Sequence, residues 1–252
     1  MSKPDFTVED LGGGIIRLML HRAPVNALTP AFLDDLSGVY DRLETDPDVR
    51  AIIVASAQKV LSGGLDLKEA QGFDKADEME IVRGLNQSFT KLYGLPKPTI
   101  CAVNGAAIAG GFFFVLGCDF RIGSPRASVG LAEVRVGATL PTGPEEIAKA
   151  ELRPSDLRKL LLSGQPMNAE QALAAGILDE VVGADQLAER AIKIAQSFAA
   201  LPPKTYVAAK RQLRQETVQR IEIAMKNGAN TPKGGWFSDE TKPAMKAMVA
   251  PK

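Results

Sequence analysis

Short apolar runs alternate with segments of helical periodicity along the first half of the chain. FTVED and IIRLML, separated by three glycines, are typical of two strands joined by a tight turn. RAIIVAS and TICAVNG are β-branched apolar runs of the kind that form buried strands. Apolar residues recur at spacings of three and four from residue 29 to 43 and again from about residue 78 to 93, which predicts two amphipathic helices. This alternation of strands and helices predicts an α/β fold.

The second half of the chain has a different pattern. From about Pro144 it is mostly helical, apart from a short GILDEVV strand near residue 179. Pro202-Pro203 begins a further helix, and the SDE segment at residues 238–240 has the composition of a cap and acidic first turn of a last one. We therefore predict a core of residues 1–195 that holds the site, and a helical region of residues 196–252 that covers it and serves in oligomerisation.

Composition narrows the classes of function. The 252 residues carry 30 Lys and Arg against 30 Asp and Glu, so no net charge draws the chain to nucleic acid or to an anionic membrane. No apolar run approaches membrane-spanning length, and the N-terminus has no apolar signal segment, so we expect a cytoplasmic protein. Cys101 and Cys118 lie in apolar contexts and are expected to be buried thiols. His21 is the only histidine, and no cluster has metal-ligand spacing, so we expect no bound metal.

Two glycines stand at the predicted start of a helix in IAGGFFFVLG, residues 108–117, directly after the TICAVNG strand. A helix N-terminus leaves backbone N–H groups unpaired, and a glycine such as Gly110 lets a ligand oxygen approach them closely. The phenylalanines at 112–114 lie about 100° apart around such a helix, which predicts burial on every side. The same pattern also suits plain tight packing, so it does not establish a site alone.

A second glycine pair lies in SGGLDL, residues 62–67, and follows the AIIVAS strand. The turn can expose the Leu65 N–H, although by itself this segment is better explained as a plain surface loop. Two such turns, each following an apolar strand, can direct two backbone N–H groups at one oxygen, which is the arrangement of an oxyanion hole.

These segments resemble the enoyl-CoA hydratase/isomerase, or crotonase, family. SGGLDLKE, LPKPTICAVNGAAIAGG, GCDFRIG, ASVGLAEVRVG and AEQALAAGILDEVV occur in the family's order and cover nearly the whole chain. The resemblance implies a ClpP-like spiral of ββα units with a C-terminal helical region, assembled as homotrimers or dimers of trimers. It also implies an acyl-CoA thioester as substrate, bound through the N–H groups of Leu65 and Gly110, and no cofactor apart from the coenzyme A of that thioester.

One position departs from the hydratase pattern. Hydratases of the family carry two catalytic glutamates, and the first lies one helical turn beyond the donor glycine, where this chain has Phe113. The second matches Glu133 in GLAEVRVG, whose pKa an apolar lining should raise towards neutrality. A single carboxylate suffices to move a double bond, so the resemblance is stronger to Δ3,Δ2-enoyl-CoA isomerases of mitochondrial type. The alternatives are an enoyl-CoA hydratase with Glu145 as a reserve acid, a decarboxylase or hydrolase of the family, or a non-catalytic acyl-CoA binder.

The resemblance further implies substrate contacts from several positions around these motifs. Asp66 suits turn stabilisation better than catalysis, and Lys68 fits a CoA contact or a plain surface role equally well. Trp236 and Phe237 are expected to pack either on the nucleotide end of CoA or in a subunit interface. The expected substrate-binding residues are Val25, Ala27, Gly64, Asp66, Lys68, Gly111, Phe113 and Phe237.

Overall fold

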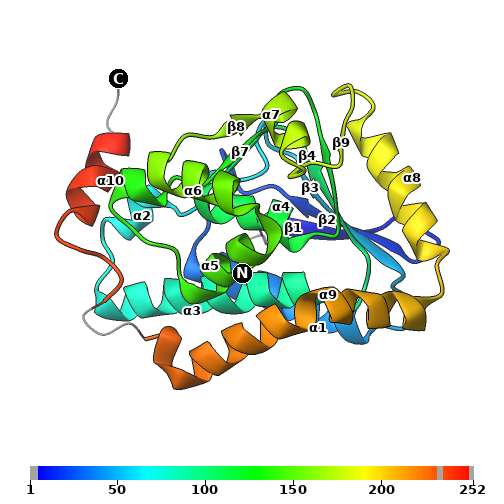
Figure 1. Ribbon diagram of the computed structural model, residues 1–252, viewed down its shortest axis with the longest axis horizontal. Coiled ribbons are helices and arrows are strands. Elements are labelled where there is room, and N and C mark those ends of the chain that lie inside the picture. Colours follow the sequence, from blue (N-terminus) through cyan, green and yellow to red (C-terminus); the bar gives the residue numbers. More distant parts are fainter. Residues whose placement is uncertain (1–4, 232–234, 250–252) are drawn as a thin grey trace.

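Two sheets form the centre of the fold. The structure, a computed structural model, describes residues 5–231 and 235–249 (Figure 1). The six-stranded sheet has the order β1 (Phe6–Asp10), β2 (Ile15–Leu20), β3 (Ala51–Ser56), β4 (Thr99–Val103), β6 (Phe120–Gly123) and β9 (Glu180–Val181). The three-stranded sheet has the order β5 (Ala106–Ile108), β7 (Ser128–Gly130) and β8 (Met167–Asn168). β1 pairs antiparallel with β2, and the pairs from β2 to β9 are parallel.

Successive turns of the chain repeat one pattern and wind into a spiral. A strand of the larger sheet leads to a segment at the smaller sheet and then to a helix. β4 leads to β5, the 3-10 helix η1 (Ala109–Phe112) and α4 (Phe113–Gly117), whereas β6 leads to β7, the 3-10 helix η2 (Glu133–Val136) and α5 (Thr142–Glu151). The preceding turn of the spiral has the same pattern. After β3, Ser62 forms a parallel bridge to Ala107 of β5, and the chain then continues into α2 (Leu67–Ala70) and α3 (Lys75–Gly94). This confirms the predicted α/β spiral of ββα units.

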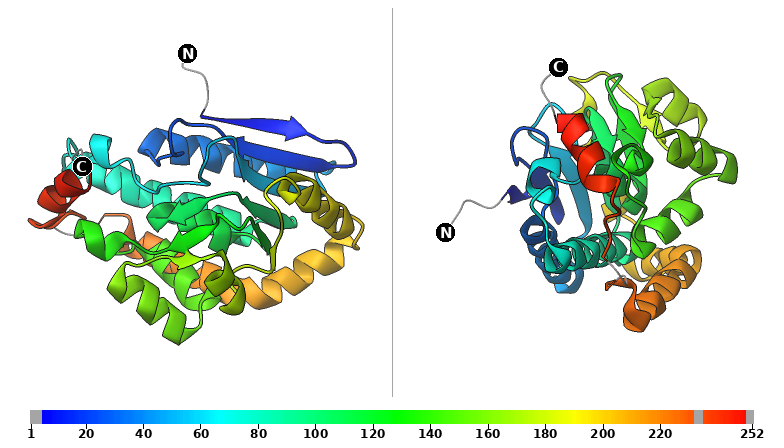
Figure 2. Two further views of the ribbon diagram at one scale, coloured as in Figure 1. Left: turned by 90° about the horizontal axis from the view of Figure 1, so that it is seen from above. Right: turned by 90° about the vertical axis from the view of Figure 1, so that its left-hand side faces the viewer.

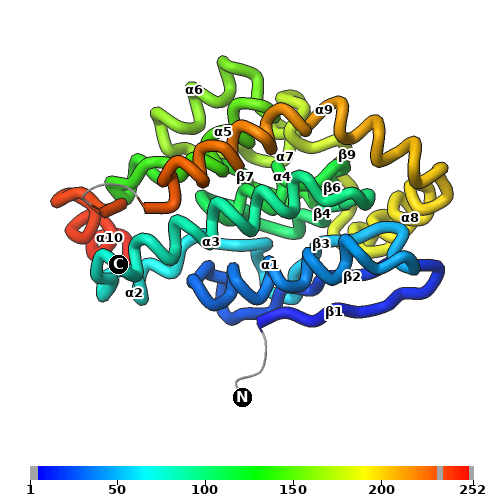
Figure 3. Tube along the Cα trace, turned by 90° about the horizontal axis from the view of Figure 1, so that it is seen from below, coloured from blue at the N-terminus to red at the C-terminus, as the bar shows by residue number. Residues whose placement is uncertain are grey.

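Helices cover both faces of the larger sheet. On one face α1 (Pro30–Thr45), α3 and α9 (Pro203–Ala224) run side by side, as Figure 3 shows. On the other face α8 (Leu187–Ala199) packs across β2, β3, β4 and β6. Strands buried on both faces need apolar side chains in both directions. In β3, Ile52 and Val54 face the main core, whereas Ile53 packs in the smaller cluster beneath α8.

Local signals account for most helix boundaries. The Thr29 hydroxyl accepts the Phe32 N–H at 3.2 Å, and Pro30 occupies the first helical position, which confirms the predicted start of α1. α6 (Pro154–Ser163), α7 (Ala169–Ala174) and the π-helical turn η3 (Met225–Ala229) complete the second half. The last helix is a correction, because α10 (Thr241–Val249) begins after residues 238–240. The hydroxyl of Thr241 donates to the Gly137 carbonyl at 2.6 Å, so tertiary contacts decide this boundary.

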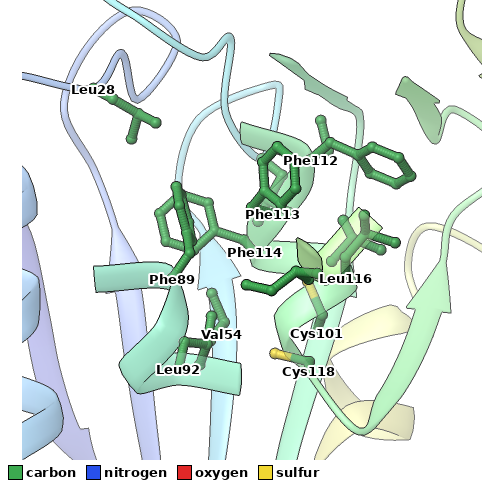
Figure 4. Packing of buried hydrophobic residues seen from close by; sticks show 14 of the residues in the cluster. Leu28, Val54, Phe89, Leu92, Cys101, Phe112, Phe113, Phe114, Leu116 and Cys118 are labelled. Carbon is green, nitrogen blue, oxygen red and sulfur yellow. The ribbon is translucent and has the colours of Figure 1, made fainter. Parts of the chain in front are cut away.

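The three consecutive phenylalanines enter the core in different directions, as predicted. Phe112, Phe113 and Phe114 are fully buried, and the last two pack on Phe89 of α3 with ring centroids 5.6 and 5.3 Å away (Figure 4). Cys101 and Cys118 are buried free thiols beneath them. Within the ranges 5–231 and 235–249, the helices include none whose length and apolar character would suit a bilayer crossing.

Candidate active site

The two glycine turns predicted from the sequence lie against each other. Gly64 has a φ of 81°, and a methyl group there would lie 2.8 Å from the Ile108 carbonyl oxygen and 3.2 Å from the Gly110 nitrogen. Gly111 packs equally closely on Ser62, whose carbonyl oxygen would be 2.5 Å from an added methyl group. Only glycine permits this backbone approach, which brings residues 63–65 and 108–110 to one place.

The amides of Leu65 and Gly110 are the two predicted oxyanion donors. Leu28 donates its N–H to the Gly64 carbonyl at 2.8 Å and accepts the Asp66 N–H at 2.9 Å, so the backbone on either side of Leu65 is fixed. Within the part of the chain that the structure describes, neither Leu65 N nor Gly110 N donates a hydrogen bond. Both residues line one pocket. Two fixed and unengaged amides in an apolar pocket suit the binding of a developing oxyanion.

The pocket has a volume of about 90 Å³ and an almost wholly apolar lining. It lies where the two glycine turns meet the η2 segment and the C-terminal segment. Among the described residues that line it, Glu133 is the only one with an ionisable side chain. Its apolar wall includes Leu65, Leu67, Leu85, Phe113, Val136, Leu140, Trp236 and Met248.

Glu133 is the first residue of η2 and is buried, with 7% of its surface exposed. Its Oε2 atom is fully buried and has no hydrogen-bond partner in the described residues. Burial without a cationic partner disfavours the charged form, so the pKa of Glu133 is raised from 4.5 to about 7. A carboxyl group with this pKa can both accept and return a proton near neutral pH.

Phe113 occupies the position one turn beyond Gly110 and forms part of the pocket wall. Its ring is fully buried against Phe89 and Phe112. Hydrocarbon therefore lines the pocket at this position.

Most other predicted contact residues lie outside the pocket lining. Gly64 does not line the pocket, but it contacts the 108–110 turn, which does. Asp66 caps α2 and pairs with Arg22 at 2.9 Å. Burial pushes the Asp66 pKa up, but hydrogen bonds from Arg22 and the α2 amides outweigh it and leave the pKa lowered. Lys68 is exposed on α2.

The remaining contact residues have structural partners. Val25 is exposed and packs beside Gly63, whereas Ala27 is buried and accepts a hydrogen bond from Arg22. Phe237 stacks on Phe73 with ring centroids 6.3 Å apart. Their contacts to coenzyme A stay predictions.

Two features of the site were not predicted from the sequence. Trp236, expected at the nucleotide end of CoA or in an interface, lines the pocket of its own chain together with Met248. Glu78 binds the backbone that carries this tryptophan, although it lies 158 residues earlier in the chain. Glu145, the reserve acid, lies outside the pocket lining and pairs with Lys149 at 2.7 Å. No local pattern could have revealed these placements.

Comparison with known proteins places this chain in a family. The model of the enoyl-CoA hydratase/isomerase family matches residues 10–240. Carnitinyl-CoA dehydratase of Proteus mirabilis is 32% identical over 215 residues, which are 85% of this chain and 82% of that protein. An enoyl-CoA hydratase structure from Mycobacterium ulcerans has a TM-score of 0.84 at 28% identity, covering 91% of this chain and 100% of the other. A Mycobacterium tuberculosis protein, described as an enoyl-CoA isomerase with one structure and as a probable enoyl-CoA hydratase with another, has a TM-score of 0.81 in both. The first structure is 28% identical and covers 89% of this chain and 97% of the other.

These likenesses extend over most of the chain and agree with its spiral fold and its paired glycine turns. The protein therefore belongs to the enoyl-CoA hydratase/isomerase, or crotonase, family of acyl-CoA enzymes.

Proposed function

We propose that this enzyme converts 3-enoyl-CoA to 2-enoyl-CoA, with Glu133 as the proton shuttle and the amides of Leu65 and Gly110 as the oxyanion hole. The observation that carries the proposal is the composition of the pocket: among its described lining residues one carboxyl group is surrounded by hydrocarbon, with Phe113 at the position of a second acid.

The proposed reaction moves one proton and one double bond. The Glu133 carboxylate accepts a proton from C2, and the electron pair of that C–H bond enters a dienolate that extends from the thioester oxygen to C4. The two amides stabilise the negative oxygen. The protonated Glu133 then gives the proton to C4, which leaves the double bond between C2 and C3. No further cofactor enters this reaction, and Phe113 helps to keep out water that would compete for the proton.

Hydration of 2-enoyl-CoA is the second candidate, because relatives named hydratases and dehydratases occur among the proteins that this chain resembles. Hydration needs a water molecule held and activated beside C3 as well as a proton for C2. The apolar lining around Glu133 offers little to hold that water, which favours isomerisation.

A product assay separates the two reactions. The purified protein is given 3-hexenoyl-CoA and 2-hexenoyl-CoA in separate reactions, and the products are identified by chromatography and mass. We expect 2-hexenoyl-CoA from the first substrate and little 3-hydroxyhexanoyl-CoA from the second. Conversion of the second substrate alone would favour the hydratase.

The Glu133→Gln variant tests the role of the carboxyl group. It keeps the size of the side chain, so acyl-CoA affinity should persist while turnover falls by roughly 10²–10⁴, the usual contribution of a general acid–base group. Glu145→Gln is the matched control, because Glu145 lies outside the pocket lining and pairs with Lys149. Unchanged turnover in Glu133→Gln would exclude this mechanism, and a parent protein that binds acyl-CoA without turnover would be a non-catalytic binder.

We also infer that the enzyme acts in the cytoplasm, in fatty acid metabolism, and assembles as a homotrimer or a dimer of trimers. Support for the assembly comes from Val134 of η2 and Leu162 of α6, which are 50% and 71% exposed on elements that pack together. Analytical ultracentrifugation would measure the assembly, and a monomer at micromolar concentration would contradict it.

A further inference from the structure

The C-terminal segment, residues 235–249, lies across one end of the molecule, as the right-hand view of Figure 2 shows. Its helix α10 packs against α2 and η2, the two elements on either side of the pocket. Two residues of this segment, Trp236 and Met248, complete the pocket lining. The residues that form one wall of the pocket therefore lie more than 90 positions after Glu133 in the sequence.

Trp236 is held in its place from two sides. Its indole Nε1 donates to the Thr139 carbonyl at 3.0 Å, which ties the ring to the loop after Glu133. Its backbone N–H donates to Oε2 of Glu78 at 2.7 Å. The tryptophan thus connects the segment that carries Glu133 with the first turns of α3.

Glu78 forms hydrogen bonds to the turn that carries Trp236. The same Oε2 atom accepts the Phe237 N–H at 3.1 Å, so one carboxylate oxygen binds two consecutive amides. Glu78 is buried, with 7% of its surface exposed. Gly235 precedes the turn with a φ of 96°, and any side chain there would collide with the Glu78 carboxylate. Acidic side chains are rarely buried, so a buried Glu78 that binds two backbone amides fixes the position of this turn.

The pocket is small for a long acyl chain. A cavity of about 150 Å³ holds one benzene ring. The 90 Å³ of this pocket therefore holds only a few groups of methylene size. A short acyl chain fits that space, and a much longer chain meets the Trp236 wall.

We propose that Trp236 limits the length of the acyl chain and that Glu78 is a positioning residue which holds Trp236 in that role. The inference rests on the proposed acyl-CoA substrate but not on the reaction that follows binding. It assigns the enzyme to short-chain acyl-CoA thioesters. Removing either the indole or the carboxylate that positions it opens the pocket at this wall.

The test measures binding of saturated hexanoyl-CoA and dodecanoyl-CoA by titration calorimetry, so it does not depend on turnover. The wild type should bind hexanoyl-CoA at least roughly tenfold more tightly, and Trp236→Ala should remove this preference by strengthening dodecanoyl-CoA binding roughly tenfold, since buried methylenes favour binding. Trp236→Phe keeps a ring at the wall and should retain most of the preference. Glu78→Ala should shift the preference in the same direction as Trp236→Ala, and Glu78→Gln, which keeps an acceptor oxygen, should restore it.

Equal binding of the two thioesters by the wild type, or an unchanged preference in a folded Trp236→Ala protein, would overturn the inference. Circular dichroism establishes folding, and a Glu78→Ala protein that fails to fold leaves Trp236→Ala and Glu78→Gln to decide. A chain-length preference in a protein without isomerase turnover would support the pocket wall while refuting the proposed reaction. Absence of binding to both thioesters would refute both proposals.

Discussion

At the scale of single residues, Glu133 and Asp119 show how surroundings decide what a buried carboxylate does. Asp119 contacts Lys210 at 2.7 Å and Arg214 at 3.0 Å; burial raises its pKa, but these two cations outweigh burial, so the pKa is lowered. Glu133 has hydrocarbon around it, and burial raises its pKa to about 7. The first carboxylate is a permanent anion suited to structure, and the second is suited to exchange a proton.

The pH dependence of the rate follows from the pKa of Glu133. Only the carboxylate form accepts the C2 proton, so kcat/KM for 3-hexenoyl-CoA should rise with pH and reach half its plateau near pH 7. Well below that midpoint it should fall tenfold for each pH unit. Initial rates between pH 5.5 and 8.5 would check this, and a flat profile would show that another group limits the reaction.

Protein stability should report the same pKa without any substrate. Below about pH 4.5 the folded and unfolded states both keep the Glu133 proton, so the group has no effect on the free energy of unfolding. As pH rises from 4.5 to about 7 the unfolded chain loses this proton first, and the folded state is destabilised by roughly 3 kcal/mol.

Glu133→Gln stays neutral and avoids this loss. Urea unfolding at pH 5 and pH 8 should therefore show the variant gaining roughly 2–3 kcal/mol on the wild type between the two conditions. A difference that stays constant with pH would mean that Glu133 has an ordinary pKa in the folded protein.

At the scale of elements, the site depends on two turns that touch through glycine. Gly64→Ala introduces a methyl group 2.8 Å from the Ile108 carbonyl oxygen, at a φ that already disfavours alanine. The turns must move apart, and the amides of Leu65 and Gly110 with them. Because one misplaced oxyanion donor costs roughly 10²–10³ in kcat, we expect a loss of that order in steady-state kinetics.

Gly12→Ala is the control for backbone strain alone. Gly12 has a φ of 83° but no heavy atom within 4 Å of an added methyl group, and it lies in the turn before β2. Its variant should lose about 1 kcal/mol of stability and keep the wild-type kcat/KM. Equal kinetic losses in both variants would show that strain, not the separation of the two turns, lowers the rate.

At the scale of the whole molecule, a buried ionic cluster attaches α9 to the larger sheet. Asp119 directly precedes β6, accepts the Thr99 N–H of β4 at 2.9 Å and the Tyr206 hydroxyl at 2.9 Å, and binds Lys210 and Arg214 of α9. These contacts span about 90 residues of sequence and join α9 to the start of β6.

Asp119→Ala should strongly destabilise the protein, because it leaves Lys210 buried without its anion and leaves Arg214 only its longer contact with Glu151. Breaking a buried pair in this way removes roughly 3–5 kcal/mol from the free energy of unfolding, which urea titration measures. Glu189→Gln breaks the exposed pair with Lys193 and should leave the unfolding midpoint unchanged. A loss no larger than in that control would mean that α9 is attached mainly by apolar packing.

The sequence by itself determined the order of strands and helices, the buried phenylalanines and the two glycine turns. These features depend on periodicity, caps and backbone freedom, which are properties of neighbouring residues. The tertiary structure decided where α10 begins, that Trp236 lines the pocket, and that Glu78 holds the turn that carries it. The reason is physical: the contact of distant segments arises only when the chain has packed, so no local pattern around Trp236 shows that it meets Glu78 and the loop after Glu133.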